Sequence, residues 1–326
     1  MRKIEAIPEA REYGSFLREQ QEALLKTDQL ARIGSMNMTA WGAHPALLES
    51  LNSDIQRQKP FSLIRLGDGE GNVLFWGFRR IGYPRLARFC MDNIWLMMFG
   101  RSGQTDDFCK LHEDMQLAIR GADYLGMAQI ASYEQSIAHL CDCPDNALDI
   151  RGQAGAATVW DWISGNMEQR TDGGGPVLIN AWFHTELTPV ALRGLLGAAT
   201  RLSLITCHST LLDRFVLTFG VRPGSTYLIP PQYSNANQGH DVAHYPDRFG
   251  QIAADLASRD LTGELFLVGA GIVGKIYCNL IKKQGGMAID AGSMMDVWMG
   301  LGVRQYQDPP FIEKHRLPEF AGPPAG

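Results

Sequence analysis

The chain has 326 residues, of which 45% are hydrophobic and 20% are charged. A chain of this size forms one large domain or two smaller ones with a substantial core, which excludes a wholly disordered protein. Its formal net charge of −5 argues against broad electrostatic binding to nucleic acid or to anionic lipid. Glycine is in excess, with 35 residues, or about 11% against a usual ~7%. This excess favours an enzyme with many tight turns over a scaffold.

No apolar run reaches the ~18 residues that a bilayer span needs, and the first residues lack the apolar stretch of a signal peptide. We therefore expect a cytoplasmic protein with no transmembrane segment. The sequence holds 6 cysteines and no CxxC pair. The close pair Cys141 and Cys143 has no second pair that would complete a zinc site, so reduced thiols are expected.

Two helical patterns come first along the chain. Residues 8–33 are rich in helix formers, and their apolar positions suit an amphipathic helix with one apolar face. These positions are Phe16, Leu17, Leu24, Leu25 and Leu30. Such a helix is suited to docking or to homo-oligomer formation. A second helical pattern over 44–58 leads into the main domain.

From residue 61 onward, short apolar runs alternate with longer amphipathic segments. Strands are predicted at 61–66, 123–128, 176–180, 201–207, 226–230, 264–269 and 286–290. Strands that are apolar nearly throughout and alternate with helices indicate a mostly parallel sheet covered on both faces, so the predicted fold class is Rossmann-like α/β. We expect an N-terminal helical extension over 1–57, an α/β domain over 58–304 and a proline-rich tail over 305–326. Because the tail shows no helical pattern, it is predicted to be extended or loosely packed.

A first group of candidate site residues follows the first predicted strand. Arg65 ends that strand, and Gly67, Asp68, Gly69 and Glu70 form a turn at the carboxyl edge of the sheet, where open α/β folds bind ligands. Two carboxylates with one glycine between them suit a hard divalent cation, and Arg65 suits a phosphate. An equal alternative is that both acids only stabilise the start of a helix.

A second group lies near the end of the domain. Gly269, Gly271 and Gly274 have GxGxxG spacing between an apolar strand and a helix, and Asp290 follows at the end of the next strand. The exposed amides of such a turn bind a dinucleotide or another phosphate. A close-packed turn without a ligand is the third alternative. The strand-poor sequence after Asp290 argues against a dinucleotide domain, which needs further βαβ units.

Further candidates follow other predicted strands. Asp296, beyond the last strand, is a candidate for recognising a substrate hydroxyl, with an ordinary surface acid as the alternative. Trp182 follows the strand at 176–180 and would serve as an aromatic platform, although core packing is the favoured interpretation. His208 is expected at a helix start or on the rim. His240 lies in a predicted loop, where phosphate or sugar contact and plain surface structure both stay open. No grouping of Cys, His and an acid is evident in the sequence, so nucleophilic hydrolase chemistry has no support.

Together the two groups resemble the GT-D-type glycosyltransferases. The resemblance rests on an RxGDGE motif at 65–70 after the first strand and on a GGxAxDxG strand end at 285–292, and it extends from about residue 58 to 304. It implies a Rossmann-like fold that uses a nucleotide-diphosphate sugar, with Asp68 and Glu70 near a divalent cation, Mn²⁺ or Mg²⁺. Where better-known members carry a histidine after the last strand's glycine, this chain has Ser293.

The first hypothesis is therefore a metal-dependent glycosyltransferase. Asp68 and Glu70 would hold the cation, and Asp296 would act on the acceptor hydroxyl. The predicted donor contacts are Arg65, Gly67, Gly69, Gly269, Gly271, Gly274, Asp290 and His240. A UDP-sugar is the first expected donor, and a glycan or glycoconjugate of a surface polysaccharide is the expected acceptor. The alternatives are an NAD(P)-dependent oxidoreductase with Asp290 on the ribose, and a non-catalytic nucleotide-binding module.

Overall fold

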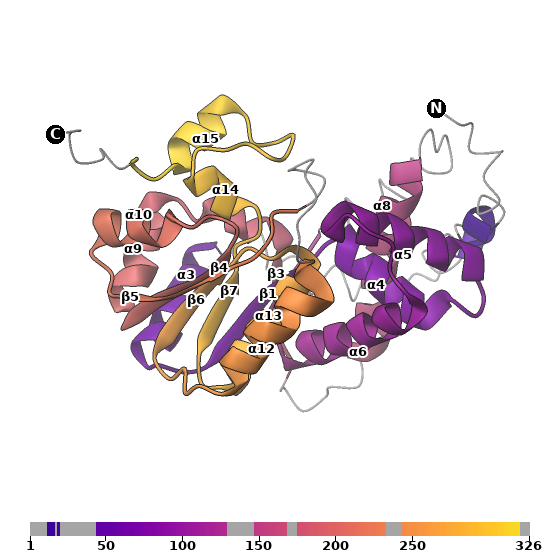
Figure 1. Ribbon diagram of the computed structural model, residues 1–326, viewed down its shortest axis with the longest axis horizontal. Helices are drawn as coiled ribbons and strands as arrows, with labels where there is room; N and C mark the ends of the chain where they lie inside the picture. Colours follow the sequence, from indigo (N-terminus) through magenta and orange to yellow (C-terminus); the bar gives the residue numbers. More distant parts are fainter. Residues whose placement is uncertain are drawn as a thin grey trace. The chain divides into compact units, whose positions relative to one another are not determined.

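The computed structural model describes residues 12–16, 18–19, 44–128, 147–167, 175–232 and 243–319 (Figure 1). Within this part of the chain, a 7-stranded parallel sheet has the order β3-β2-β1-β7-β6-β4-β5. The predicted Rossmann-like α/β class is thus confirmed. The strands are β1 (Phe61–Leu66), β2 (Tyr124–Met127), β3 (Val177–Asn180), β4 (Arg201–Thr206), β5 (Pro223–Leu228), β6 (Glu264–Val268) and β7 (Met287–Asp290).

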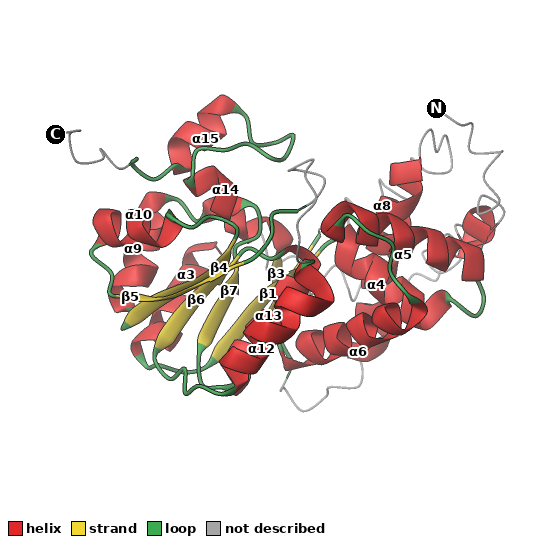
Figure 2. Cartoon of the chain, viewed as in Figure 1, coloured by secondary structure: helices red, strands yellow, loops and turns green. Residues whose placement is uncertain are grey.

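The helices account for the longer amphipathic segments (Figure 2). The α-helices are α3 (His44–Gln56), α4 (Asp68–Arg79), α5 (Pro84–Phe99), α6 (Thr105–Gly121), α8 (Ala147–Met167), α9 (Pro189–Ala198), α10 (Leu211–Phe219), α12 (Phe249–Ala257), α13 (Gly274–Lys283), α14 (Met294–Trp298) and α15 (Pro309–His315). Shorter turns are η2 (Ala181–Glu186), η3 (His244–Arg248) and η4 (Gly271–Val273). Among the described residues, no helix combines the length and the apolar character that crossing a membrane requires.

Each of the predicted strand segments forms a strand, because buried parallel strands are apolar on both faces. The largest shift concerns β5, which begins at Pro223 rather than at 226. β5 is the last strand in the sheet order, and a proline is tolerated at the first residue of an edge strand because the missing N–H interrupts no central ladder.

Contacts between Cα atoms divide the chain into two compact units. The first comprises Met1–Gly42 and Arg65–Ala181, and the second comprises Ala43–Ile64 and Trp182–Gly326. This division differs from the predicted boundaries at 57 and 304. Arg65, Asp68 and Glu70 belong to the first unit, whereas the glycine turn of α13 and Asp296 belong to the second. Each unit is described by itself.

The helices of the first unit pack through glycine. A Cβ atom on Gly71 of α4 would lie 1.8 Å from the carbonyl oxygen of Gly155 on α8, and a Cβ on Gly155 would lie 2.1 Å from the carbonyl oxygen of Asp68. Both positions therefore exclude any side chain, because real Cβ contacts are never so short. This close approach fixes the start of α4 against α8.

The described part of the N-terminal extension packs on its own chain. Residues 12–16 are helical, and Phe16 has no exposed surface. Its ring lies edge-on to Phe75 of α4, with 5.0 Å between centroids, and Glu19 pairs with Arg79 at 2.6 Å. Phe16 therefore offers no surface to a second copy. The remaining predicted positions of this helix lie outside the described residues.

The second unit holds the central strands and covers them with helices. All residues of β6 and β7 are buried, and helices lie on both faces of this part of the sheet, with α12 and α13 in front in Figure 1. Parallel strands joined through helices bring their carboxyl ends to one edge. Every segment that follows a strand of this unit therefore begins at that edge.

The predicted extended tail is wrong for residues 309–315, which form α15. Asp308 accepts a hydrogen bond from the Phe311 amide at 2.9 Å, and Pro309 occupies the first position of the helix. Prolines are tolerated in the first turn, because its N–H groups have no partner within the helix. His315 of this helix is fully buried, which anchors this part of the tail in the second unit.

Candidate functional site

The sheet of the second unit contains a topological switch point between β4 and β6. The chain runs from β4 to β5 on one side and from β6 to β7 on the other, although β4 and β6 are neighbours. In open α/β sheets, ligands bind outside the carboxyl ends of strands at such a point. Segments that begin at the ends of β4, β6 and β7 are therefore the first place to search for a site.

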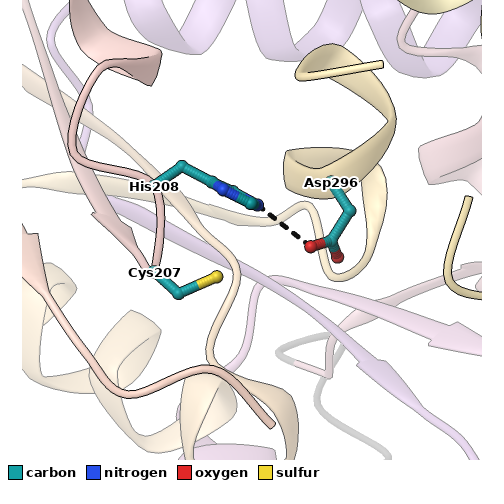
Figure 3. A group of neighbouring side chains, drawn as sticks. All are labelled: Cys207, His208 and Asp296. Carbon is teal, nitrogen blue, oxygen red and sulfur yellow. Dashed lines mark hydrogen bonds and ion pairs between the residues drawn. The ribbon is translucent and has the colours of Figure 1, made fainter. Parts of the chain in front are cut away.

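Three candidate side chains meet at this edge (Figure 3). Cys207 and His208 follow β4, and Asp296 lies on α14 after β7. The His208 Nε2 atom is 3.0 Å from Asp296 Oδ1. One ligand atom from each of the three side chains lies within 4.8 Å of the others, and all three residues are partly buried. Asp296, a predicted candidate for substrate recognition, thus lies beside His208, a predicted rim residue.

The pKa of His208 reflects this environment. Burial lowers the pKa of the imidazole, but hydrogen bonding to Asp296 and to Cys207 outweighs burial and raises the pKa to about 9. A carboxylate that accepts a hydrogen bond stabilises the charged imidazolium. At neutral pH, His208 therefore carries its proton and pairs with Asp296.

Rigid elements position the pair. The backbone N–H of His208 donates to Thr206 Oγ1 at 3.2 Å, which fixes the turn that leaves β4. On α14, Trp298 is fully buried and its indole N–H donates to the carbonyl oxygen of Leu187 at 3.2 Å. Side chains held by packed neighbours keep their geometry when a ligand binds.

The glycine turn after β6 serves internal packing. A Cβ on Gly269 would lie 2.3 Å from Met295 Cγ, and the Gly269 amide already donates to the carbonyl oxygen of Ile205 at 2.8 Å. Gly271 has a φ of +56°, which favours glycine, whereas a Cβ on Gly274 would make only ordinary contacts. These contacts are those of a close-packed βα turn, and phosphate binding at this turn stays a prediction.

Asp290 is engaged inside the protein. It has no exposed surface, its Oδ2 atom pairs with Lys275 Nζ at 3.0 Å, and its Oδ1 atom accepts the Gly292 amide at 3.1 Å. Lys275 also donates to the carbonyl oxygen of Gly271 at 3.1 Å. A carboxylate in this position does not fit contact with a ribose hydroxyl, which the oxidoreductase alternative needs.

In the first unit, the two predicted metal ligands each have a protein partner. Glu70 is 6% exposed and accepts the Gly67 amide at 2.8 Å, which closes the first turn of α4. Asp68 is the first residue of α4, and its Oδ2 atom lies 2.8 Å from Arg151 Nη1. Gly69 is buried in the same turn. These contacts match the alternative in which the acids stabilise the helix start.

A divalent cation at Asp68 and Glu70 would compete with contacts that both carboxylates already make. The charge of Arg151 already balances Asp68, and moving Glu70 toward a cation would break its bond to the amide of Gly67. The divalent cation therefore stays a prediction from the motif. Arg65 is the fifth residue of β1, and its predicted contact with a phosphate stays a prediction.

The predicted aromatic platform is exposed. Trp182 has 45% of its surface exposed, so the favoured interpretation of core packing is wrong. Its ring stacks on buried His184, with 5.9 Å between centroids, and meets Tyr306 edge-on at 5.0 Å. His184 Nε2 lies 3.2 Å from the Tyr306 hydroxyl. Trp182 is thus held by ring contacts on one side and open to solvent on another.

The loop that carries His240 lies outside the described residues. His244, from the same sequence segment, is buried and its Nε2 atom lies 3.2 Å from the Tyr277 hydroxyl. Burial and the charge of Arg248 lower the pKa of His244 to about 3. This histidine is therefore a neutral core residue.

The expectation that no grouping of Cys, His and an acid exists was wrong. The sequence analysis did not place Cys207 in the site, because Asp296 is distant in sequence and follows a different strand, β7. A signal was present, since the dipeptide Cys207–His208 directly follows a predicted strand, as Asp296 follows the last one.

Comparison of the chain with known protein families, curated proteins and solved structures finds no match.

Proposed function

We propose that the chain is a glycosyltransferase that moves a sugar from a nucleotide-diphosphate sugar to a hydroxyl of a glycan or glycoconjugate. A UDP-sugar is the first donor to test. The proposal is carried by the His208–Asp296 pair at the switch point. Glycosyl transfer needs a base beside the acceptor hydroxyl, at the edge where parallel sheets bind ligands. The motifs that resemble GT-D-type glycosyltransferases support the same class of donor.

Asp296 is the proposed base. The acceptor oxygen forms a bond to the anomeric carbon, the bond from that carbon to the diphosphate oxygen breaks, and Asp296 takes the acceptor's proton. His208 keeps its own proton, because its pKa is about 9, and its bond to Asp296 Oδ1 holds that carboxylate in position. His208 is in this scheme a positioning residue.

The diphosphate is assigned to the start of α13, where the helix dipole favours an anion. The Gly269 amide already donates to the carbonyl oxygen of Ile205, which leaves the turn from Gly271 to Gly274 for the diphosphate. A divalent cation held by Asp68 and Glu70 is the motif's prediction, and no step of the scheme depends on it.

The test is a thermal-shift panel of nucleotide sugars on the full chain, with and without Mn²⁺, followed by an assay of nucleoside diphosphate release. A donor at 100 times its Kd adds about 2.7 kcal/mol to the free energy of unfolding. Stabilisation by a UDP-sugar and release of UDP with a glycan acceptor are expected. Stabilisation by NADH alone, or full turnover by Asp296→Asn, would contradict the proposal.

A further inference from the structure

Cys207, His208 and Asp296 form a set of metal-ligand atoms in the second unit. The thiol sulfur, one imidazole nitrogen and one carboxylate oxygen all lie within 4.8 Å of one another, and the side chains converge from the end of β4 and from α14 (Figure 3). We propose that these residues bind a zinc ion. This inference goes beyond the proposed glycosyl transfer and does not rest on it.

The chemistry of the ligand atoms favours zinc over Mg²⁺ or Mn²⁺. Magnesium and manganese prefer oxygen ligands, whereas a thiolate with an imidazole is typical of zinc. Zinc bonds of about 2.0–2.3 Å place neighbouring tetrahedral ligands roughly 3.3–3.6 Å apart. The observed 3.0 Å between His208 Nε2 and Asp296 Oδ1 is close to this spacing. The distances from Cys207 Sγ to the other two ligand atoms are at most 4.8 Å, so zinc would draw the thiol toward them.

The charge and the exposure of the cluster also suit zinc. Zinc would displace the proton of the His208 imidazolium and that of the Cys207 thiol, and the resulting thiolate and the Asp296 carboxylate would balance the two positive charges of the ion. The side chains of His208 and Asp296 are 15% and 19% exposed, so the ion would be shielded but reachable. Three protein ligands leave a fourth position for water or substrate, as in catalytic rather than structural zinc sites.

The scaffold holds the ligands before metal binds. His208 is tied to Thr206 through its amide, and the residues around Asp296 on α14 are buried. Zinc would engage both Asp296, which is the proposed base, and His208, which positions it. Metal-loaded and metal-free protein should therefore differ in transfer rate, although metal binding itself is measured without any substrate.

The test uses the full chain after dialysis against a chelator. Titration calorimetry with zinc chloride should show one zinc ion per chain, and Co²⁺ should give a thiolate-to-cobalt charge-transfer band. Cys207→Ser should lose this band and bind zinc more than about 100-fold more weakly, since loss of an outer-shell partner alone costs 10–100-fold. Cys109→Ser, a matched change at another partly buried free thiol, should bind as the unchanged chain does.

Absence of zinc binding by the unchanged chain overturns the inference, as does unchanged affinity in Cys207→Ser. Circular dichroism checks that the variant folds. If Cys207→Ser does not fold, the cobalt spectrum of the unchanged chain provides the test. A spectrum without the thiolate-to-cobalt band would also overturn the proposed zinc site. Zinc binding without any sugar transfer would leave this inference standing and remove only the proposed function.

Discussion

His208 and Asp296 are separated by 88 residues in the chain, yet His208 Nε2 lies 3.0 Å from Asp296 Oδ1. Their strands, β4 and β7, are separated in the sheet only by β6, and both residues follow the carboxyl ends. The contact is therefore a direct consequence of strand order. The sequence predicts Asp296 as a candidate site residue and His208 only as a residue at a helix start or on the rim, and the fold brings the two together.

Removing the charge of Asp296 should abolish most of the transfer activity. Asp296→Asn keeps an oxygen that accepts from His208 but cannot take a proton, so kcat should fall by about 10²- to 10⁴-fold. Donor affinity, measured by calorimetry with a UDP-sugar, should change little. Asp213→Asn, at an exposed acid in the first turn of α10, serves as the matched control. An unchanged kcat in Asp296→Asn would exclude the assigned role.

Two substitutions of Glu70 separate helix capping from cation binding. Glu70→Gln keeps an oxygen for the Gly67 amide and should leave stability within about 0.5 kcal/mol of the unchanged chain, whereas Glu70→Ala should lose roughly 0.5–2 kcal/mol. Urea unfolding measures both. If the Glu70 carboxylate also holds Mn²⁺, Glu70→Gln should in addition lose metal-dependent turnover.

The turnover assay with EDTA completes this comparison. Loss of turnover in Glu70→Gln together with inhibition by EDTA supports the motif's divalent cation. Full turnover of Glu70→Gln in EDTA would leave Glu70 a structural role, which its 2.8 Å bond to the Gly67 amide displays at the helix start.

Gly71→Ala should destabilise the protein strongly. Its Cβ would lie 1.8 Å from the carbonyl oxygen of Gly155, so α4 and α8 must separate. Overpacking of this kind costs typically 1–3 kcal/mol, and contact with backbone places the expected loss at about 3 kcal/mol or more. Thermal unfolding measures the change.

Gly197→Ala is the matched control for this substitution. Gly197 also lies in a helix, α9, but nothing lies within 4 Å of its added Cβ. Alanine should therefore stabilise the chain by about 0.5–1 kcal/mol, because it restricts the unfolded state. Equal effects of Gly71→Ala and Gly197→Ala would contradict the close contact of α4 with α8.

Stability should fall in acid because of His244. Its folded pKa of about 3 lies below the ordinary value of ~6.5, so the unfolded state binds the proton more tightly. The contribution of His244 is complete above pH 6.5 and is lost as pH falls from there toward 3, by up to about 1.4 kcal/mol per pH unit. His244→Phe, which keeps a ring against Tyr277, should show a smaller loss between pH 7 and pH 5 in urea unfolding. An identical slope in both proteins would rule this out.

Prolines show where a local signal was misinterpreted. In residues 305–326 they indicated an extended tail, but Asp308 followed by Pro309 begins α15. An N-cap acid before a proline is a helix start, because both residues act on N–H groups that have no partner within the helix. At the start of α9, the Thr188 hydroxyl has the same capping role before Pro189.

The sequence by itself determined the α/β class and where each described strand lies along the chain, apart from the earlier start of β5. Buried parallel strands are apolar runs and can therefore be identified locally. It also marked Asp296, because that residue follows the last strand. The order of the strands was decided only by tertiary packing, which depends on contacts between distant segments. That order brings Cys207 and His208 to Asp296. Packing between distant segments also pairs Asp290 with Lys275 and Asp68 with Arg151.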